Sequence, residues 1–419
     1  MAIQQMRDRQ KWLHNWMVKE TGKVFHFQGD GRGSLPKSVR QHDMISKHLG
    51  KEGIRLRALA EQEEAVGHHE TALELFYEAS NVFGAAQHPV FENNAEKRAL
   101  HSASIQCYDR VRELAPYRIE HLEIPWGDGY VYANLHLLPD GSTAPCVIVI
   151  PGCDMTKEMY PYPSANQAHA RGMHVITVDG PGQAENNLAG TLLTADNYPG
   201  AMSAVVDYLE GRDEVQSDAI GLYGVSFGSF WSTQTVAQEH RIKAHVGTWA
   251  SICDKRHLFD VESPRYKWLF AYLTGAGSEE ELDQIASAMA LDDVMADITC
   301  PTLLTIGEYD PRSPLEEVIA LYDKMTCERQ LWVHEDQHHM VTPTGRASVG
   351  DRGVWNLDTY SWMLDWLRDR FQGKPIPNSG EVTYVTTGGS GPNGTSARAA
   401  RTWLEAYGFD GASSTTNGS

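Results

Sequence analysis

The chain has 419 residues, which is enough for two or three domains or for one large domain with insertions. Its formal net charge of −19 would repel phosphate backbones and anionic lipid head groups, so we expect neither nucleic acid nor a membrane as a partner. Hydrophobic content of 41% and charged content of 22% are ordinary for a globular protein, and the first 23 residues lack the apolar core of an export signal. The six cysteines are scattered without CxxC pairs. Together these features predict a cytoplasmic protein with reduced thiols.

Residues 1–116 are predicted to be helical. Apolar residues recur at helical spacing over 54–66 and 71–86, and a further helix over 95–114 ends at Pro116. The first two segments resemble one helical repeat of a partner-binding module, but the unit does not recur at a fixed period. We therefore expect this region to pack as a helical cap on the domain that follows.

From residue 121 onward the pattern changes to short apolar strands. A hairpin is predicted over 121–138, a helix over 164–171, and continuous apolar strands at 146–150, 174–178, 220–223, 245–249, 302–306 and 330–334. Helices separate most of these strands. The alternation predicts an α/β fold over residues 117–372, with a mostly parallel sheet and helices on both faces.

Two segments depart from this alternation. Residues 254–298 are helical and acidic in character and lie between two predicted strands, where we expect a lid over the active site. After residue 372 the sequence becomes rich in Gly, Ser and Thr, and we predict that 373–419 forms a C-terminal tail that is partly flexible.

One motif carries the strongest chemical signal. Gly–x–Ser–x–Gly occupies 224–228, directly after an apolar strand and directly before a predicted helix over 229–240. This context is typical of a nucleophile elbow, in which small neighbours let a serine stand at the apex of a strained turn. The helix that follows favours developing negative charge at its N-terminus. Ser226 is therefore the predicted nucleophile.

A serine hydroxyl needs a base, and that base needs an orienting acid, in the chain order Ser, acid, His. The strand at 302–306 leads into Asp310, the predicted acid, with Glu308 as second choice. The strand at 330–334 leads into a loop that holds His338 and His339. We choose His339 as the base because the base of such loops lies several residues beyond the strand, and His338 remains its competitor.

The same loop contains a pattern that points to different chemistry. His334–Glu–Asp–Gln–His338 matches the His–Glu–x–x–His signature of zinc proteases. That signature requires both histidines on one helical face, whereas this segment begins inside a predicted strand. We therefore predict no metal site here.

The oxyanion formed by attack on a carbonyl needs two backbone donors. The amide of Phe227 is the first candidate, because it follows the nucleophile. The loop after the strand at 146–150 supplies the second, from Cys153 or Asp154. The Cys153 thiol itself is predicted to be a small packing group, since the sequence places no base beside it.

With these elements assigned, the chain resembles the α/β-hydrolase superfamily over about residues 50–370. It resembles most closely the branch that contains 2,6-dihydroxypseudooxynicotine hydrolase and the fermentation–respiration switch esterases. The motifs that carry the resemblance are Asp179–Gly–Pro–Gly–Gln183, Gly152–Cys–Asp–Met–Thr–Lys157, Gly224–Val–Ser–Phe–Gly228, Ala72–Leu–Glu–Leu–Phe76 with Gln87–His–Pro89, and Lys97–Arg–Ala–Leu100.

The resemblance implies a Ser226–Asp310–His339 triad in a cofactor-free site between lid and core, a small-molecule substrate and a homodimer. It implies cleavage either of a carbon–carbon bond beside an aryl ketone or of an ester. The enzyme of this branch that cleaves a carbon–carbon bond uses a further acidic residue after the strand that follows the elbow, which makes Asp254 or His257 an auxiliary candidate. Asp154, in the loop after the strand at 146–150, is another auxiliary candidate. The alternatives are an acyltransferase with the same triad and a non-catalytic binding protein that uses its N-terminal helices.

Overall fold

The computed structural model describes residues 39, 41, 43–261, 265–335, 337–339 and 357–385. Within these residues, nine strands form one sheet in the order β1-β2-β4-β3-β5-β6-β7-β8-β9. The strands are β1 (Ile119–Trp126), β2 (Gly129–His136), β3 (Ala144–Ile150), β4 (His174–Asp179), β5 (Val215–Val225), β6 (Ala244–Thr248), β7 (Thr302–Gly307), β8 (Arg329–His334) and β9 (Val382–Val385).

Strands β3 to β9 run parallel to one another, and β2 is antiparallel to both β1 and β4. The predicted α/β architecture, mainly parallel with an antiparallel start, is therefore confirmed. Because parallel strands end at the same edge of a sheet, the loops that follow β3, β4, β5, β7 and β8 meet along one carboxyl edge.

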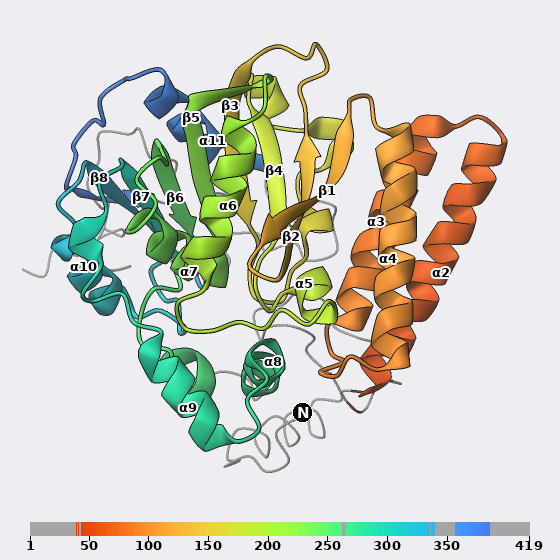
Figure 1. Cartoon of the computed structure of the whole chain (residues 1–419), viewed down its shortest axis with the longest axis horizontal. Coiled ribbons are helices and arrows are strands. Elements are labelled where there is room, and N and C mark those ends of the chain that lie inside the picture. The colour runs from red at the N-terminus through yellow and green to blue at the C-terminus, as the bar shows by residue number, and fades with distance from the viewer. Residues whose placement is uncertain are drawn as a thin grey trace, which may run out of the picture.

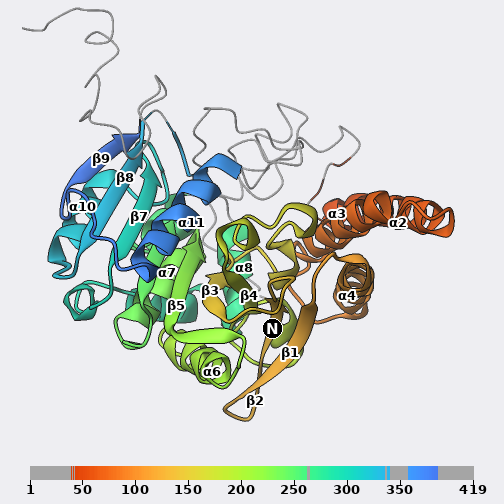
Figure 2. The ribbon, with the colours of Figure 1, turned by 90° about the horizontal axis from the view of Figure 1, so that it is seen from above.

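Helices cover both faces of the sheet, and the alternation of side chains along β3 shows why. Cys146, Ile148 and Ile150 pack into one core, whereas Val147 and Val149 pack into the other. The first core is closed by α6 (Tyr198–Glu210), α7 (Phe227–Val236) and α10 (Leu315–Lys324), and the second by α11 (Leu357–Phe371). Figure 2 shows α11 on one side of the sheet and α6 on the other.

The N-terminal helices form a separate layer beside the sheet (Figure 1). They are α2 (Asp43–Ala65), α3 (His69–Gln87) and α4 (Ala95–Leu114), and their apolar faces build a third core of their own. Polar contacts tie this layer to the sheet domain: the Tyr77 hydroxyl donates to the Met159 carbonyl at 2.7 Å, and the Asn93 amide donates to the Asn187 carbonyl at 3.0 Å. The helical cap predicted from the sequence thus contacts the α/β domain directly.

The segment between β6 and β7 is helical, as predicted for the lid. It contains the π-helix η4 (His257–Val261), α8 (Arg265–Thr274), α9 (Glu279–Ala288) and the short η5 (Met295–Asp297). The ring of Phe270 in α8 lies 4.6 Å from the ring of Phe227, so α8 packs directly on the first residue of α7. None of the helices in the described ranges is long and apolar enough to cross a membrane.

Two sequence expectations are corrected by the structure. The helix predicted over 164–171 is replaced by two short 3₁₀ turns, η2 (Pro163–Ala165) and η3 (His169–Arg171), because the Asn166 side chain accepts from the Ala168 and His169 amides and interrupts the helical ladder. The region predicted as a C-terminal tail contains strand β9, which extends the sheet beyond β8. Its four residues are too short a run to stand out beside the Gly-rich sequence. Residues 386–419 lie outside the described residues.

Candidate active site

Ser226 stands at the turn between β5 and α7, in the geometry that the motif predicts. Its backbone has φ +54° and ψ −122°, a conformation that non-glycine residues rarely adopt. The neighbouring glycines make this possible: a Cβ on Gly228 would overlap the Ile150 carbonyl, and one on Gly224 would overlap the Ser232 hydroxyl. The strained turn thus holds the hydroxyl at the carboxyl edge of the sheet.

The hydroxyl of Ser226 is joined to an imidazole and a carboxylate. Ser226 Oγ lies 2.7 Å from His339 Nε2, and His339 Nδ1 lies 2.7 Å from Asp310 Oδ2. All three side chains are buried, with 7%, 1% and 3% of Ser226, His339 and Asp310 exposed. Each bond is therefore shielded from competing water. The structure brings together the serine, the histidine and the acid that the sequence analysis selected.

Backbone contacts at the ends of β7 and β8 set the position of the acid and the base. The Asp310 carboxylate accepts from the Arg312 amide at 2.9 Å through Oδ1, which leaves Oδ2 for the imidazole. The Tyr309 amide donates to the Gln337 carbonyl at 2.9 Å. Gly307 makes this approach possible, because a Cβ there would overlap the His338 carbonyl oxygen. The loop that carries His339 therefore packs against the end of β7.

The two competitors lie outside this arrangement. His338 is exposed, and its Nδ1 lies 3.1 Å from the Tyr309 carbonyl oxygen. Glu308 is half-buried, and its amide donates to the His334 carbonyl at 3.0 Å. The zinc-protease pattern has no helical geometry either, since His334 is the last residue of β8. Among the described residues, no group of three or more His, Cys, Asp or Glu side chains could hold a metal ion.

Two backbone segments border the Ser226 hydroxyl. Phe227 is the first residue of α7, where amides have no acceptor within the helix. The loop after β3 lies on the other side: a Cβ on Gly152 would be 3.3 Å from Cβ of Ser226. The first amide of α7 and the loop that carries Cys153 therefore lie on two sides of the nucleophile. Burial raises the pKa of the Cys153 thiol, which is consistent with the packing role expected for it.

Asp154 joins the loop after β3 to α8 and to the N-terminal helices. Its Oδ2 accepts from Arg265 Nη2 at 3.2 Å, and Nη1 of the same guanidinium lies 2.9 Å from Nε2 of His88. Arg265 is the first residue of α8, and His88 directly follows the last residue of α3. All three side chains are buried. Sequence reasoning selected Asp154 but missed its partners, since nothing local links positions 88, 154 and 265.

The other two auxiliary candidates make contacts elsewhere. The Asp254 carboxylate accepts from Arg256 Nε at 2.7 Å, and His257 Nε2 lies 2.7 Å from Glu317 Oε1 in α10. Asp254 lines a cavity of about 800 Å³ between the loop after β6, α9 and α10, and its lining residues do not include the serine, acid or base. Neither contact involves a residue of the Ser226–His339–Asp310 arrangement.

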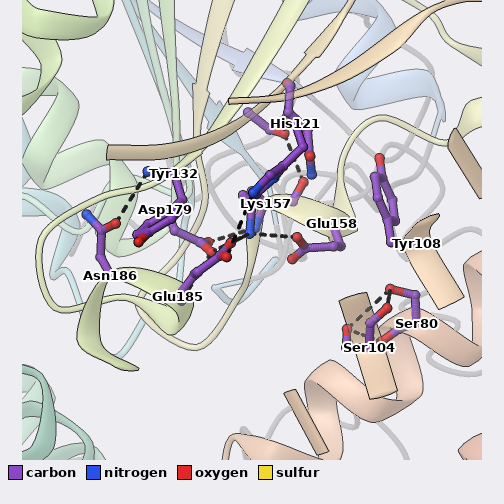
Figure 3. A network of polar contacts seen from close by, with 12 residues as sticks. Ser80, Ser104, Tyr108, His121, Tyr132, Lys157, Glu158, Asp179, Glu185 and Asn186 are labelled. Carbon is purple, nitrogen blue, oxygen red and sulfur yellow. Dashed lines mark hydrogen bonds and ion pairs between the residues drawn. The ribbon is translucent and has the colours of Figure 1, made fainter. Parts of the chain in front are cut away.

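A second buried polar network lies where the Gly152–Lys157 motif meets the Asp179–Gln183 motif. Lys157, in η1 (Lys157–Met159), is fully buried, and its ammonium lies within 3.1 Å of Glu158, Asp179 and Glu185. Figure 3 shows the ammonium at the centre of these carboxylates. Burial alone would lower the pKa of Lys157, but the three carboxylates raise it well above its ordinary value. Lys157 is therefore a fixed cation that ties the loop after β3 to the end of β4.

Comparison with known proteins places the chain in a family. The model of the prolyl oligopeptidase family matches residues 162–373. The 2,6-dihydropseudooxynicotine hydrolase of Paenarthrobacter nicotinovorans is 30% identical over 311 residues, which span 74% of this chain and 80% of that protein. Hydrolase LUC6 of a Fusarium species is 25% identical over 361 residues, or 73% of this chain and 84% of that protein.

Solved structures agree with these matches. The crystal structure of the 2,6-dihydroxy-pseudo-oxynicotine hydrolase aligns with a TM-score of 0.68 at 25% identity, covering 87% of this chain and 98% of that chain. The structure of AbyA5 aligns with a TM-score of 0.57 at 17% identity, which shows a shared fold. The chain therefore belongs to the prolyl oligopeptidase family of α/β-hydrolases.

Proposed function

We propose that this hydrolase cleaves a small aromatic or hydrophobic carbonyl compound through an acyl-enzyme on Ser226. The observation that carries the proposal is the pair of 2.7 Å contacts that join Ser226 to His339 and His339 to Asp310. This geometry supports a nucleophile, a general base and an orienting acid in those three roles. The aromatic side chain of Trp249 supports an apolar substrate, since it packs edge-on to His339 with a centroid distance of 6.0 Å.

In the proposed reaction, Ser226 Oγ attacks the carbonyl carbon while its proton passes to His339 Nε2. Asp310 holds the imidazole in the tautomer that can accept this proton. The amides of Phe227 and Cys153 stabilise the oxyanion. The tetrahedral intermediate then breaks its bond to the leaving group, which takes the proton from His339. Water attacks the acyl-enzyme with His339 again as base, releasing the carboxylic acid and restoring Ser226.

The bond broken is either a carboxylic ester or a carbon–carbon bond beside a ketone. An ester needs only a passable leaving group. A carbon–carbon bond needs an electron sink on the departing side, which the substrate itself can supply. Both reactions use the same serine, base and oxyanion donors, so one site is compatible with either.

A substrate panel tests the proposal. Wild type, Ser226→Ala and the surface control Ser142→Ala are assayed with aryl esters and with aryl 1,3-diketones, and each is incubated with a fluorophosphonate probe. We expect labelling and one preferred activity in wild type and Ser142→Ala, and loss of both labelling and turnover in Ser226→Ala. An unlabelled wild type, or an active Ser226→Ala variant, would refute the acyl-enzyme mechanism.

A further inference from the structure

We propose that Gln183 is a positioning residue for the oxyanion site and that it acts on the peptide unit joining Gly152 to Cys153. This inference rests on the proposed function, because it deepens the role of the Cys153 amide. Gln183 lies between β4 and α5 (Ala184–Leu188), at the end of the Asp179–Gln183 motif, and it is buried. It is not part of the Ser226–His339–Asp310 arrangement.

The hydrogen bonds of Gln183 fix which way its side-chain amide points. Its Oε1 accepts from the Tyr198 hydroxyl at 2.6 Å and from the Gly180 backbone amide at 3.1 Å. A backbone N–H can only donate, so this end of the side chain must be the oxygen. The NH₂ group therefore faces the opposite way, toward the loop after β3.

That NH₂ group holds two consecutive carbonyls of the oxyanion loop. Gln183 Nε2 donates to the Gly152 carbonyl at 3.0 Å and to the Pro151 carbonyl at 3.4 Å. The Gly152 carbonyl also accepts from the Met155 amide at 3.0 Å, within the turn of the loop. Gln183 thus directs its side-chain NH₂ group at this one segment from outside the loop.

The Gly152 carbonyl and the Cys153 amide belong to one rigid, planar peptide unit. The cis peptide bond found in the described residues is Tyr160–Pro161, so the unit at 152–153 is trans. In a trans unit the C=O and N–H groups point in opposite directions. By holding the carbonyl, Gln183 makes the Cys153 N–H point away from itself. The same unit borders Ser226, whose Cβ would lie 3.3 Å from a Cβ on Gly152.

Two effects on the oxyanion follow from this arrangement. The direction of the Cys153 N–H is fixed before the substrate binds, which is the condition for an effective oxyanion donor. Hydrogen bonds accepted by the Gly152 carbonyl also polarise the peptide and strengthen its N–H as a donor. Both effects operate when negative charge develops on the substrate oxygen. Gln183 is therefore expected to influence kcat more than KM.

The test compares Gln183→Met and Gln183→Glu with a matched control, Gln330→Met. Both substitutions at 183 keep the approximate length of the side chain and remove its NH₂ donors. Gln330 is also a buried glutamine that donates to a backbone carbonyl, that of Pro377 at 2.7 Å, and accepts from an indole, that of Trp366 at 2.9 Å. It lies in β8, away from the carboxyl edge. The control therefore reports the cost of losing such contacts without touching the oxyanion loop.

The readouts are kcat and KM for the best aryl ester, the inhibition constant of an aryl trifluoromethyl ketone, and thermal unfolding. Such a ketone forms an anionic adduct with the serine and so reports the oxyanion site. We expect both Gln183 variants to lose about 100-fold in kcat, as when one oxyanion donor is removed, with KM changed less than about threefold. Affinity for the ketone should fall by the same factor as kcat/KM. Gln330→Met should keep kcat and ketone affinity within about twofold of wild type.

The proposal is overturned if a folded Gln183 variant keeps wild-type kcat and ketone affinity, or if its loss falls on KM alone. Recovery of both Gln183 variants only as unfolded protein would also overturn it, because the role would then be structural. These outcomes differ from failure of the proposed function. In that case wild type itself would not be labelled at Ser226 and would not bind the ketone covalently.

Discussion

Two buried polar networks lie at the carboxyl edge of the sheet, and they differ in how their charges are satisfied. Around Lys157, one ammonium faces three carboxylates within 3.1 Å, and every group is held by oppositely charged neighbours. Around Ser226, a neutral hydroxyl and an imidazole stand in a row behind a single carboxylate. The first network holds three carboxylates around one fixed cation. In the second network, the proton of the Ser226 hydroxyl can pass to the imidazole of His339. The backbone of Ser226 is itself strained.

This difference shows how one sheet edge can carry both stability and chemistry. The Lys157 network joins η1 to the end of β4 and to α5, and its removal should destabilise the fold. The Ser226 arrangement joins the start of α7 to the loops after β7 and β8, and its removal should lower the proposed activity. Substitutions around Lys157 should therefore mainly lower stability, whereas substitutions around Ser226 should mainly lower turnover.

Replacement of Asp310 by Asn should lower kcat about 10⁴-fold, because the amide can present its NH₂ to His339 Nδ1 and favour the tautomer that cannot accept the serine proton. The fold should change little, since the side chain keeps its size. Turnover of the preferred aryl ester and the unfolding midpoint in urea measure the two effects. A variant with near wild-type turnover would remove Asp310 from the proposed mechanism.

Replacement of Lys157 by Met should lower the stability of the fold more than it lowers kcat. The buried Glu158 and Asp179 and the half-buried Glu185 would lose their cation, at a cost of about 3–5 kcal/mol in the free energy of unfolding. Urea denaturation measures this, with Arg118→Met as the control, because Arg118 is exposed and pairs with Glu120 at the surface. Loss of that surface pair should cost less than about 1 kcal/mol. Equal losses in the two variants would contradict the assigned role of Lys157.

The buried His245 should make the stability of the fold depend on pH. His245 lies in β6 with its Nε2 2.8 Å from the Ser232 hydroxyl, and burial lowers its pKa to about 3. The unfolded chain binds a proton near pH 6.5, whereas the folded protein does not, so stability is lost as pH falls below 6.5. This group alone should account for about 2 kcal/mol of the loss at pH 5.

The variant His245→Gln tests this effect, since glutamine can keep a hydrogen bond to Ser232 but does not titrate. Thermal unfolding from pH 8 to pH 5 should be less pH-dependent in the variant than in wild type, even if the variant starts from a lower midpoint. Parallel pH profiles for the two proteins would show that the folded protein protonates His245 as readily as the unfolded chain.

The smallest effect is expected at His338. Its side chain is exposed and its imidazole lies against the Tyr309 carbonyl, so His338→Gln should keep kcat within about twofold of wild type. His339→Gln, measured in the same assay, should be inactive. If instead the substitution at 338 abolished turnover, the assignment of the base would have to move by one residue.

The sequence alone is sufficient to predict those parts of the molecule whose signals are local. The strand, turn and helix around Ser226 lie within one short stretch, and so does the link from an apolar strand to Asp310. The choice between His338 and His339 rested on loop length, and the structure separates them through the contact of Tyr309 with the Gln337 carbonyl. The local pattern is enough for Ser226 and Asp310 because each closely follows a strand that the sequence predicts.

Other features depend on contacts between distant positions and leave no local pattern. Arg265 meets Asp154 only because α8 folds back over the loop after β3, and Gln183 reaches Gly152 only because β3 and β4 are neighbours. Strand β9 is recognisable once β8 offers it a partner, since its own four residues carry little periodicity. These are tertiary effects, which propensity and spacing do not encode.

The contact at Gly307 has a practical consequence for sorting relatives into active and inactive enzymes. Any larger residue there would collide with the carbonyl of His338 and displace the segment that delivers the imidazole. A homologue could therefore retain serine, aspartate and histidine in the proper order and still be unable to assemble them. The presence of glycine at position 307 is thus a useful criterion for an active enzyme in addition to the serine, aspartate and histidine.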